Sequence, residues 1–227
     1  MFTGLVESIG HVKSVQERGG DLRLVIEERR DKIAWQKVAL GDSIATSGCC
    51  LTVVEKLAKG YAADVSRESL QHTTIGEWKA GTQVNLEQSL TPESKMGGHM
   101  VSGHVDGVGV IASIQKDARS WRYQVEAPLP LARYIAHKGS ITVDGVSLTV
   151  NAVDDALFEL SIVPHTMGET IIEGYQVGTR VNLEVDLIAR YLERLLQFDT
   201  YEQAGDGGAQ DKPVSRLTAA FLKDNGY

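Results

Sequence analysis

The chain has 227 residues, of which 42% are hydrophobic and 23% are charged, a composition typical of a globular protein. Its net charge of −7 and lack of a Lys/Arg cluster argue against nucleic acid or an anionic membrane surface as a partner. No apolar run approaches the roughly 18 residues needed to cross a membrane, and no signal peptide is recognisable. We therefore expect a cytoplasmic protein that binds a small molecule or another protein, without nucleic acid or membrane.

Segments of the first half of the chain return in the second half, in the same order. MFTGLVESIGHV at 1–12 predicts a strand with a glycine kink, and MVSGHVDGVGVI at 100–111 repeats it. GDSIATSGCCLTVVE at 41–55 returns as KGSITVDGVSLTVNAV at 138–153, and GTQVNLE at 81–87 returns as GTRVNLE at 178–184. Three echoes in one order indicate a duplicated domain. The predicted repeats span 1–97 and 98–186, joined by a linker at 88–99 that contains Pro and paired Gly.

Between the echoes, β-branched runs recur at intervals of about ten residues, with glycines and charged residues between them. This spacing is typical of an antiparallel sandwich or barrel, so we expect an all-β fold. Four intervening segments predict a turn or two of helix or a loop: 31–40, 67–76, 128–139 and 164–174.

After Asp186 the hydrophobic period changes to that of a helix. Apolar residues fall at helical spacing over 187–197, and Asp186 is a plausible N-cap. A helix of about three turns with a bare apolar stripe is marginal alone, so we expect identical helices from other subunits to cover it. Residues 198–227 predict a flexible tail with a candidate short helix from Ser215 to Asn225.

The LTV echo places a thiol and a hydroxyl at matching positions, because Cys50 falls on Ser147. Period two on a strand puts Cys49, Leu51 and Val53 on the core face. Cys50 and Thr52, and their counterparts Ser147 and Thr149, then point toward solvent or a ligand. The alternative is that Cys50 is a small buried hydrophobe. Because Cys49 and Cys50 are adjacent, a disulfide between them would be strained, and we expect two reduced thiols.

Other polar residues and glycines leave alternatives open. His99 and His104 at the start of the second repeat invite a zinc hypothesis, but the spacing of known zinc motifs is absent, and a surface histidine or a proton carrier near a ligand are the other interpretations. The glycine pairs Gly4/Gly103 and Gly48/Gly145 allow either close approach of a planar ligand or the kinks and bulges that close a barrel.

Five motifs carry a resemblance to a known family: MFTGLVE, GCCLTV, GGHMVSGHVD, DGVSLTV and GTRVNLEVD. Together they resemble the riboflavin synthase family, over about residues 1–197. The resemblance implies two six-stranded antiparallel Greek-key barrels, which bind lumazine, and a C-terminal helix that assembles a homotrimer. It implies dismutation of two 6,7-dimethyl-8-ribityllumazine molecules to riboflavin and 5-amino-6-(D-ribitylamino)uracil by four-carbon transfer, without a metal or cofactor. The reacting pair would sit between the first barrel of one subunit and the second barrel of a neighbour.

The resemblance also implies roles for individual residues. Cys50, Ser147 and Thr149 would lie at the reacting centre, and His104 and Asp186 would handle protons. The substrate-binding set would comprise Phe2, Gly4, Leu5, Val6, Ser43, Leu51, Thr52, Asp64, Val65, Ser66, Arg67, Glu68, Ser69, Gly103, Val105, Lys138, Leu148, Ile162, Val163, Pro164, His165, Thr166 and Met167. One position departs from the family pattern, since His165 stands where the first repeat has Glu68.

Two non-enzymatic alternatives remain. The first is a lumazine- or flavin-binding protein of the same fold that carries its ligand without turnover. The second is a structural β-barrel module that assembles through its helix, which would leave the polar set on the ligand face unexplained.

Overall fold

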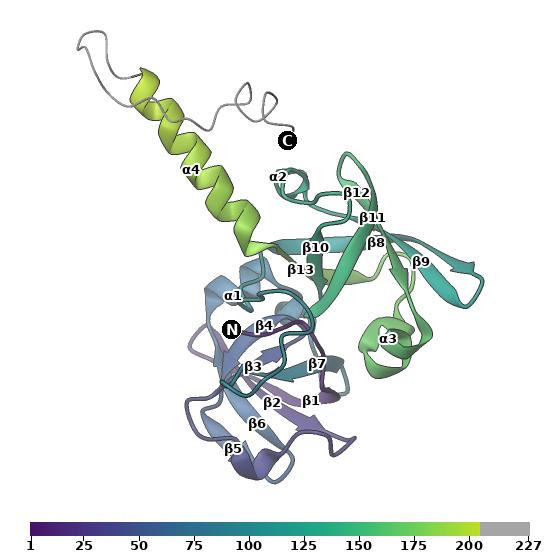
Figure 1. Ribbon diagram of the computed structural model, residues 1–227. Helices are drawn as coiled ribbons and strands as arrows, with labels where there is room; N and C mark the ends of the chain where they lie inside the picture. The colour runs from purple at the N-terminus through teal and green to yellow at the C-terminus, as the bar shows by residue number, and fades with distance from the viewer. Residues whose placement is uncertain (205–227) are drawn as a thin grey trace. The chain divides into compact units, whose positions relative to one another are not determined.

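A computed structural model describes residues 1–204, with side chains through residue 197. Buried residues alternate with more accessible ones along strands in both repeats, as period two predicts. Figure 1 shows these strands. The first repeat holds β1 Ser8–Arg18, β2 Asp21–Glu28, β3 Ser43–Thr46, β4 Cys49–Thr52, β5 Glu55–Leu57, β6 Gly60–Val65 and β7 Gln83–Gln88. The second holds β8 Gly107–Asp117, β9 Ser120–Glu126, β10 Ser140–Val143, β11 Val146–Asp154, β12 Leu157–Ile162 and β13 Arg180–Val185.

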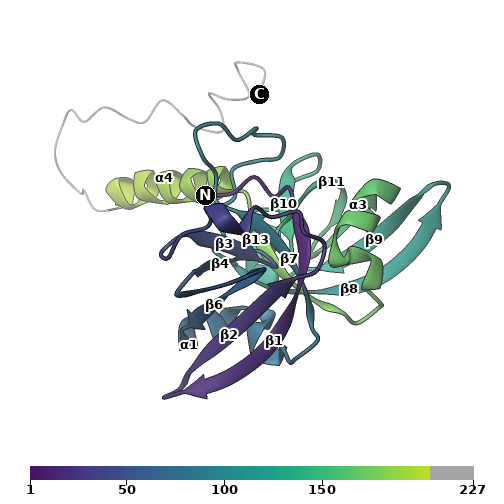
Figure 2. The ribbon, with the colours of Figure 1, turned by 90° about the horizontal axis from the view of Figure 1, so that it is seen from below.

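The two repeats share one strand order. The second is a closed barrel, β10-β11-β12-β9-β8-β13, and the first is a seven-stranded sheet with the equivalent order β4-β3-β7-β1-β2-β6-β5, which does not close. The difference is an interruption at residues 53–54, which splits the strand matching β11 into β4 and β5. Val54 N–H still donates to Ala62 O at 2.9 Å across this gap. Figure 2 shows the long β1–β2 hairpin of the first repeat and its counterpart β8–β9.

Each repeat has its own hydrophobic core. Buried side chains such as Leu24, Ile44 and Leu86 fill the first, and Val125, Ile141 and Leu183 fill the second. The all-β class, the duplication and the barrel architecture expected from the sequence are therefore confirmed.

The helices are short except at the C-terminal end of the described chain. Those between strands are η1 Trp35–Lys37, α1 Arg67–His72, η2 Thr74–Glu77, α2 Leu129–Ala132, α3 Pro164–Glu169 and η3 Ile171–Gly174. The last helix, α4, runs from Leu187 to Ala204, so it continues past Gln197 into the segment expected to be flexible. The sequence explains the extension, because residues 198–204 contain neither Gly nor Pro. The short helix expected at Ser215–Asn225 lies outside the described residues.

The sequence prediction of a strand over residues 1–12 is wrong at its start. β1 begins at Ser8 and its counterpart β8 at Gly107. The residues before them form two extended arms, which we call the first arm (1–7) and the second arm (100–106). The arms pair with each other where Phe2 N–H donates to Val101 O at 2.7 Å and Val101 N–H to Phe2 O at 3.1 Å.

Candidate functional site

Each arm crosses to the opposite repeat and lies against the strand that carries the thiol or the hydroxyl. Ser147 N–H donates to Gly4 O, and Cys50 N–H donates to Gly103 O, both at 2.8 Å. Farther along, Val6 packs on the core of the second barrel and Val105 on the core of the first. Thus Cys50 and Ser147 occupy equivalent sites, and each site is completed by the other repeat.

The two arm glycines are required by geometry. Gly4 has φ +74° and Gly103 has φ +81°, values that L side chains rarely adopt. A Cβ on Gly4 would lie 2.6 Å from Ser147 Cβ, and one on Gly103 would lie 2.7 Å from Cys50 Cβ. The close approach that the sequence left open is therefore made to the strand of the opposite repeat. Gly48 and Gly145 likewise approach each other, since a Cβ on Gly48 would lie 2.8 Å from Gly145 N.

A buried glutamate holds each arm in place. Glu87 accepts from Thr3 N at 2.6 Å, Thr3 Oγ1 at 2.7 Å and Gly4 N at 3.0 Å. Glu184 accepts from Ser102 N at 2.6 Å, Ser102 Oγ at 2.7 Å and Gly103 N at 2.9 Å. Burial raises the pKa of both carboxyls, and these hydrogen bonds oppose the rise. Neither residue was predicted from the sequence, although each is the last residue of the repeated VNLE motif, and this repetition could have identified both.

The two faces of β4 differ in burial as predicted. Cys49 and Leu51 are buried in the core, and Thr52 on the opposite face is exposed. Burial raises the pKa of the Cys49 thiol well above its ordinary range, so this sulfur is a core atom and not a nucleophile. Cys50 is half-buried, packed beside Phe2, and remains the reactive candidate.

Burial on β11 follows the same pattern: Val146 and Val150 are buried on the core face, and Thr149 on the opposite face is exposed. Ser147 is half-buried, and its Oγ lies 2.7 Å from Nδ1 of His99 in the linker. The sequence marked His99 only as one of two histidines at the start of the second repeat. His104 is exposed, and its backbone N–H donates to Ser102 Oγ at 3.2 Å.

The other predicted site residues lie at several places in the two repeats. Ser43 pairs with Thr52 across β3 and β4, and Lys138, at φ +62°, donates to Asn151 Oδ1 at 3.3 Å. Asp186 directly precedes α4. The segment 64–69 spans the end of β6 and the start of α1, and 162–167 spans the end of β12 and the start of α3. Phe2, Leu51, Val65 and Ile162 are buried, whereas Leu5, Asp64, Arg67, Glu68, Val163, Pro164 and His165 are exposed.

Two hollows open beside predicted binding residues. One, of about 570 Å³, has Leu5, Ser43 and Glu87 in its lining. The other, of about 630 Å³, is lined by Trp121, Tyr123, Pro164, Met167 and Tyr175, among others, and lies beside α3 of the second repeat. Space for a ligand therefore adjoins part of the 162–167 segment.

Where the repeats meet, paired asparagines bridge them. Asn85 Nδ2 donates to Asp144 O at 2.9 Å and Asn182 Nδ2 to Ser47 O at 2.8 Å. The symmetry fails at Asp144, a buried carboxylate in the place of Ser47 that accepts from the Tyr175 hydroxyl. Burial raises the pKa of Asp144 to about 7, and the hydrogen bonds from Tyr175 and the Asn182 N–H act in the opposite direction.

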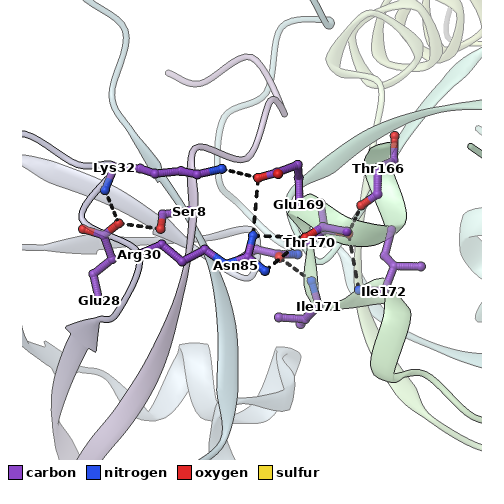
Figure 3. Close-up of polar contacts among 11 residues, drawn as sticks. Ser8, Glu28, Arg30, Lys32, Asn85, Thr166, Glu169, Thr170, Ile171 and Ile172 are labelled. Carbon is purple, nitrogen blue, oxygen red and sulfur yellow. Dashed lines mark hydrogen bonds and ion pairs between the residues drawn. The ribbon is translucent and has the colours of Figure 1, made fainter. Parts of the chain in front are cut away.

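The end of α3 is also held by the first repeat (Figure 3). Both terminal nitrogens of Arg30 donate to Gly168 O at 3.0 Å, and Arg30 lies 3.3 Å from Glu169 Oε2. Lys32 forms a second ion pair with Glu169. Asn85 Oδ1 accepts from Ile171 N at 2.9 Å just beyond the helix. Helix α3, which begins within the segment that the resemblance assigns to ligand binding in the second barrel, is thus anchored at its end to the first repeat.

Comparisons with known proteins agree with the duplicated fold. The family model of the lumazine binding domain matches residues 3–89 and 102–186, which defines a protein with two tandem lumazine-binding domains. Riboflavin synthase of Photobacterium leiognathi is 44% identical over 89% of this chain and 92% of its own. Riboflavin synthase of Photobacterium phosphoreum is 43% identical over 100% of this chain and 99% of its own. The chain therefore belongs to the riboflavin synthase family.

A solved structure supports the fold. The crystal structure of LumP complexed with 6,7-dimethyl-8-(1'-D-ribityl) lumazine matches with a TM-score of 0.73 at 24% identity, over 82% of this chain and 99% of that one. Among residues 1–204, no group of three or more His, Cys, Asp or Glu is placed to hold a metal ion. No described helix is long and apolar enough to cross a membrane.

Proposed function

We propose that this chain is a riboflavin synthase, which converts two molecules of 6,7-dimethyl-8-ribityllumazine into riboflavin and 5-amino-6-(D-ribitylamino)uracil. The observation that carries the proposal is the pair of equivalent positions at which the two repeats carry different nucleophilic atoms, sulfur in Cys50 and oxygen in Ser147. A reaction between two identical substrates that leave as different products requires two similar sites with different chemistry. The family relationship supports the same conclusion.

Catalysis would begin with positioning. Holding two lumazines against each other replaces a bimolecular encounter by a local step, which can lower the barrier by roughly 7 kcal/mol or more. Cys50, Ser147 and Thr149 are assigned to the reacting centre, where one of them or a water adds to C7 of a lumazine. His104 and Asp186 are assigned to proton transfer at the acidic C7 methyl group. The exposed position of His104 is compatible with a site that a neighbouring subunit completes.

Substrate binding is assigned to the arms and to the segments at the ends of β6 and β12. In each barrel, the arm from the other repeat and the neighbouring strand would hold the ring edges. Residues 64–69 and 162–167 would hold the ribityl chain, with Ser43 and Lys138 as further contacts. In the second barrel His165 can donate to a ribityl hydroxyl where the first offers the carboxylate of Glu68.

We propose a homotrimer assembled through α4. Five apolar side chains on this helix are between 55% and 65% exposed in the single chain: Ile188, Tyr191, Leu192, Leu195 and Leu196. Such a stripe is normally covered in an assembly. Truncation after Asp186 should yield monomers with little activity, as measured by sedimentation and turnover. A fully active monomer would contradict the shared site.

The competing function is that of a lumazine- or flavin-binding protein without turnover. The polar groups of Cys50, Ser147, Thr149 and His104 are all present, which favours the enzyme. The test is to incubate the purified protein with 6,7-dimethyl-8-ribityllumazine and follow flavin absorbance and the pyrimidinedione product. Binding without either product would exclude the enzyme.

The roles of Cys50 and Ser147 are tested by single substitutions. Cys50→Ala and Ser147→Ala should each lower kcat by roughly 100-fold, while the dissociation constant for the lumazine changes far less. Unchanged rates would remove these residues from the reaction. The cytoplasmic location stays a prediction that cell fractionation would check.

A further inference from the structure

The linker between the repeats closes over Ser147. At Gly98 an added Cβ would lie 2.0 Å from Thr3 O and 3.1 Å from both Cβ and Oγ of Ser147. The next N–H, that of His99, donates to Thr3 O at 3.2 Å. The paired glycines of the linker therefore do more than connect two domains, because Gly98 lets the chain run directly against the Ser147 side chain.

His99 then places an imidazole on the Ser147 hydroxyl. Its Nδ1 lies 2.7 Å from Ser147 Oγ, and its Nε2 is buried without a hydrogen-bond partner among the described residues. Burial lowers the pKa of His99, and the nearby negative charge of Asp186 opposes that shift. Burial therefore favours the neutral form of this imidazole. A neutral imidazole with its proton on Nε2 can accept a hydrogen bond from the serine hydroxyl at Nδ1.

The equivalent environment of Cys50 is different. Its side chain packs beside Phe2, Ala45 and Val101, none of which can titrate. The strands and arms occur twice in the chain, but the linker that joins the repeats occurs once. The linker thus supplies an imidazole to the hydroxyl, and its single copy has no counterpart at the thiol. The chemistry matches, because a serine hydroxyl is a weak nucleophile that needs a neighbouring base, whereas a thiol is intrinsically more nucleophilic.

We propose that His99 is a positioning residue for Ser147, which holds the hydroxyl as a hydrogen-bond donor to Nδ1 and leaves its oxygen lone pairs available to the lumazine or water in the second barrel. This inference rests on the proposed function. It makes the linker a part of the second site and gives the Cys50/Ser147 difference a structural cause.

Kinetics of three variants test the proposal. His99→Ala should lower kcat by about 10- to 100-fold, with KM for 6,7-dimethyl-8-ribityllumazine changed by less than about 3-fold if the hydroxyl and not the binding surface is affected. His99→Asn, whose side-chain oxygen can reach the Nδ1 position, should recover most of the loss. In a Ser147→Ala background, His99→Ala should have no further effect, because the two residues act as one unit.

Additive losses in the Ser147→Ala background, or failure of His99→Asn to recover activity while the folded fraction is unchanged, would overturn the proposal. Failure of the wild type to form riboflavin would instead overturn the proposed function. In that case the ¹⁵N chemical shifts of the His99 ring test the hydrogen bond between His99 and Ser147. They should report a hydrogen bond accepted at Nδ1 in the wild type that is lost in Ser147→Ala, and identical shifts would exclude the contact.

Discussion

Single residues fix how closely the two repeats approach, and the arm glycines are the most demanding of them. Gly4→Ala combines an unfavourable φ of +74° with a Cβ 2.6 Å from Ser147. We expect it to lower the free energy of unfolding by more than about 2 kcal/mol. Chemical denaturation of the wild type and the variant measures the change.

Gly41→Ala is the matched control. Gly41 also has positive φ, +89°, but a Cβ there would meet nothing within 4 Å. Its counterpart in the second repeat is Lys138 at φ +62°, so a side chain is tolerated at this position. Only backbone strain of about 1 kcal/mol is expected. Equal destabilisation of both variants would show that contact with Ser147 does not constrain Gly4.

Asp144 predicts a pH dependence of stability. Its folded pKa of about 7 lies above the ordinary value of 3.8, so between these values the folded protein keeps a proton that the unfolded chain releases. The contribution of Asp144 to the free energy of unfolding therefore falls as pH rises through this window. Asp144→Asn should remove the fall, and the stability of the variant relative to the wild type should be greater at pH 8 than at pH 5. Urea denaturation at both pH values checks this, and parallel curves would contradict it.

At this scale the sequence predicted side-chain faces better than contacts. Period two placed Cys50 and Ser147 on the strand face away from the core, because the alternation is local. The partnerships of Glu87 with the first arm and of His99 with Ser147 join residues 84 and 48 positions apart. Local periodicity contains no information about such pairs.

Among the elements, α3 of the second repeat is anchored differently from its counterpart α1. Arg30 and Lys32 hold Glu169 (Figure 3), whereas the corresponding loop of the second repeat, PLPLA at 128–132, carries no charge to reach α1. We expect Glu169→Gln to speed amide hydrogen exchange in α3. Global stability should change by less than about 1 kcal/mol, because exposed ion pairs contribute little.

A control for this prediction breaks another ion pair between the repeats. Arg180 and Glu77 are paired across the same boundary and lie outside α3. Glu77→Gln should leave exchange in α3 unchanged. Equal acceleration of exchange by both substitutions would mean that general loosening of the repeats, and not the bond to Glu169, controls the helix.

The elements themselves were largely predictable, with two informative exceptions. Strands and short helices follow from periodicity and turn residues. The arms have strand-like sequences, but their backbone groups bond to the opposite repeat, as in the pair Phe2–Val101. Helix α4 was predicted too short because its apolar stripe ends near Leu196, although residues 187–204 contain no Gly or Pro that would end the helix earlier.

For the whole molecule, duplication creates two equivalent positions, at Cys50 and Ser147, and each is contacted by the arm of the opposite repeat. The sequence echoes predicted the duplication, but crossing is a property of the tertiary structure. In the proposed trimer the first barrel of one subunit faces the second barrel of a neighbour, so Cys50 and Ser147 of different chains serve one reaction. This is the central claim of the proposed mechanism.

Subunit mixing tests it most directly. Cys50→Ala and Ser147→Ala proteins are each assayed alone for riboflavin formation from 6,7-dimethyl-8-ribityllumazine, then dissociated together and reassembled. Random reassembly should pair an intact first barrel with an intact second barrel at about one quarter of the interfaces, so the mixture should regain up to about that fraction of wild-type activity. A mixture no more active than its two components would contradict a site shared between subunits.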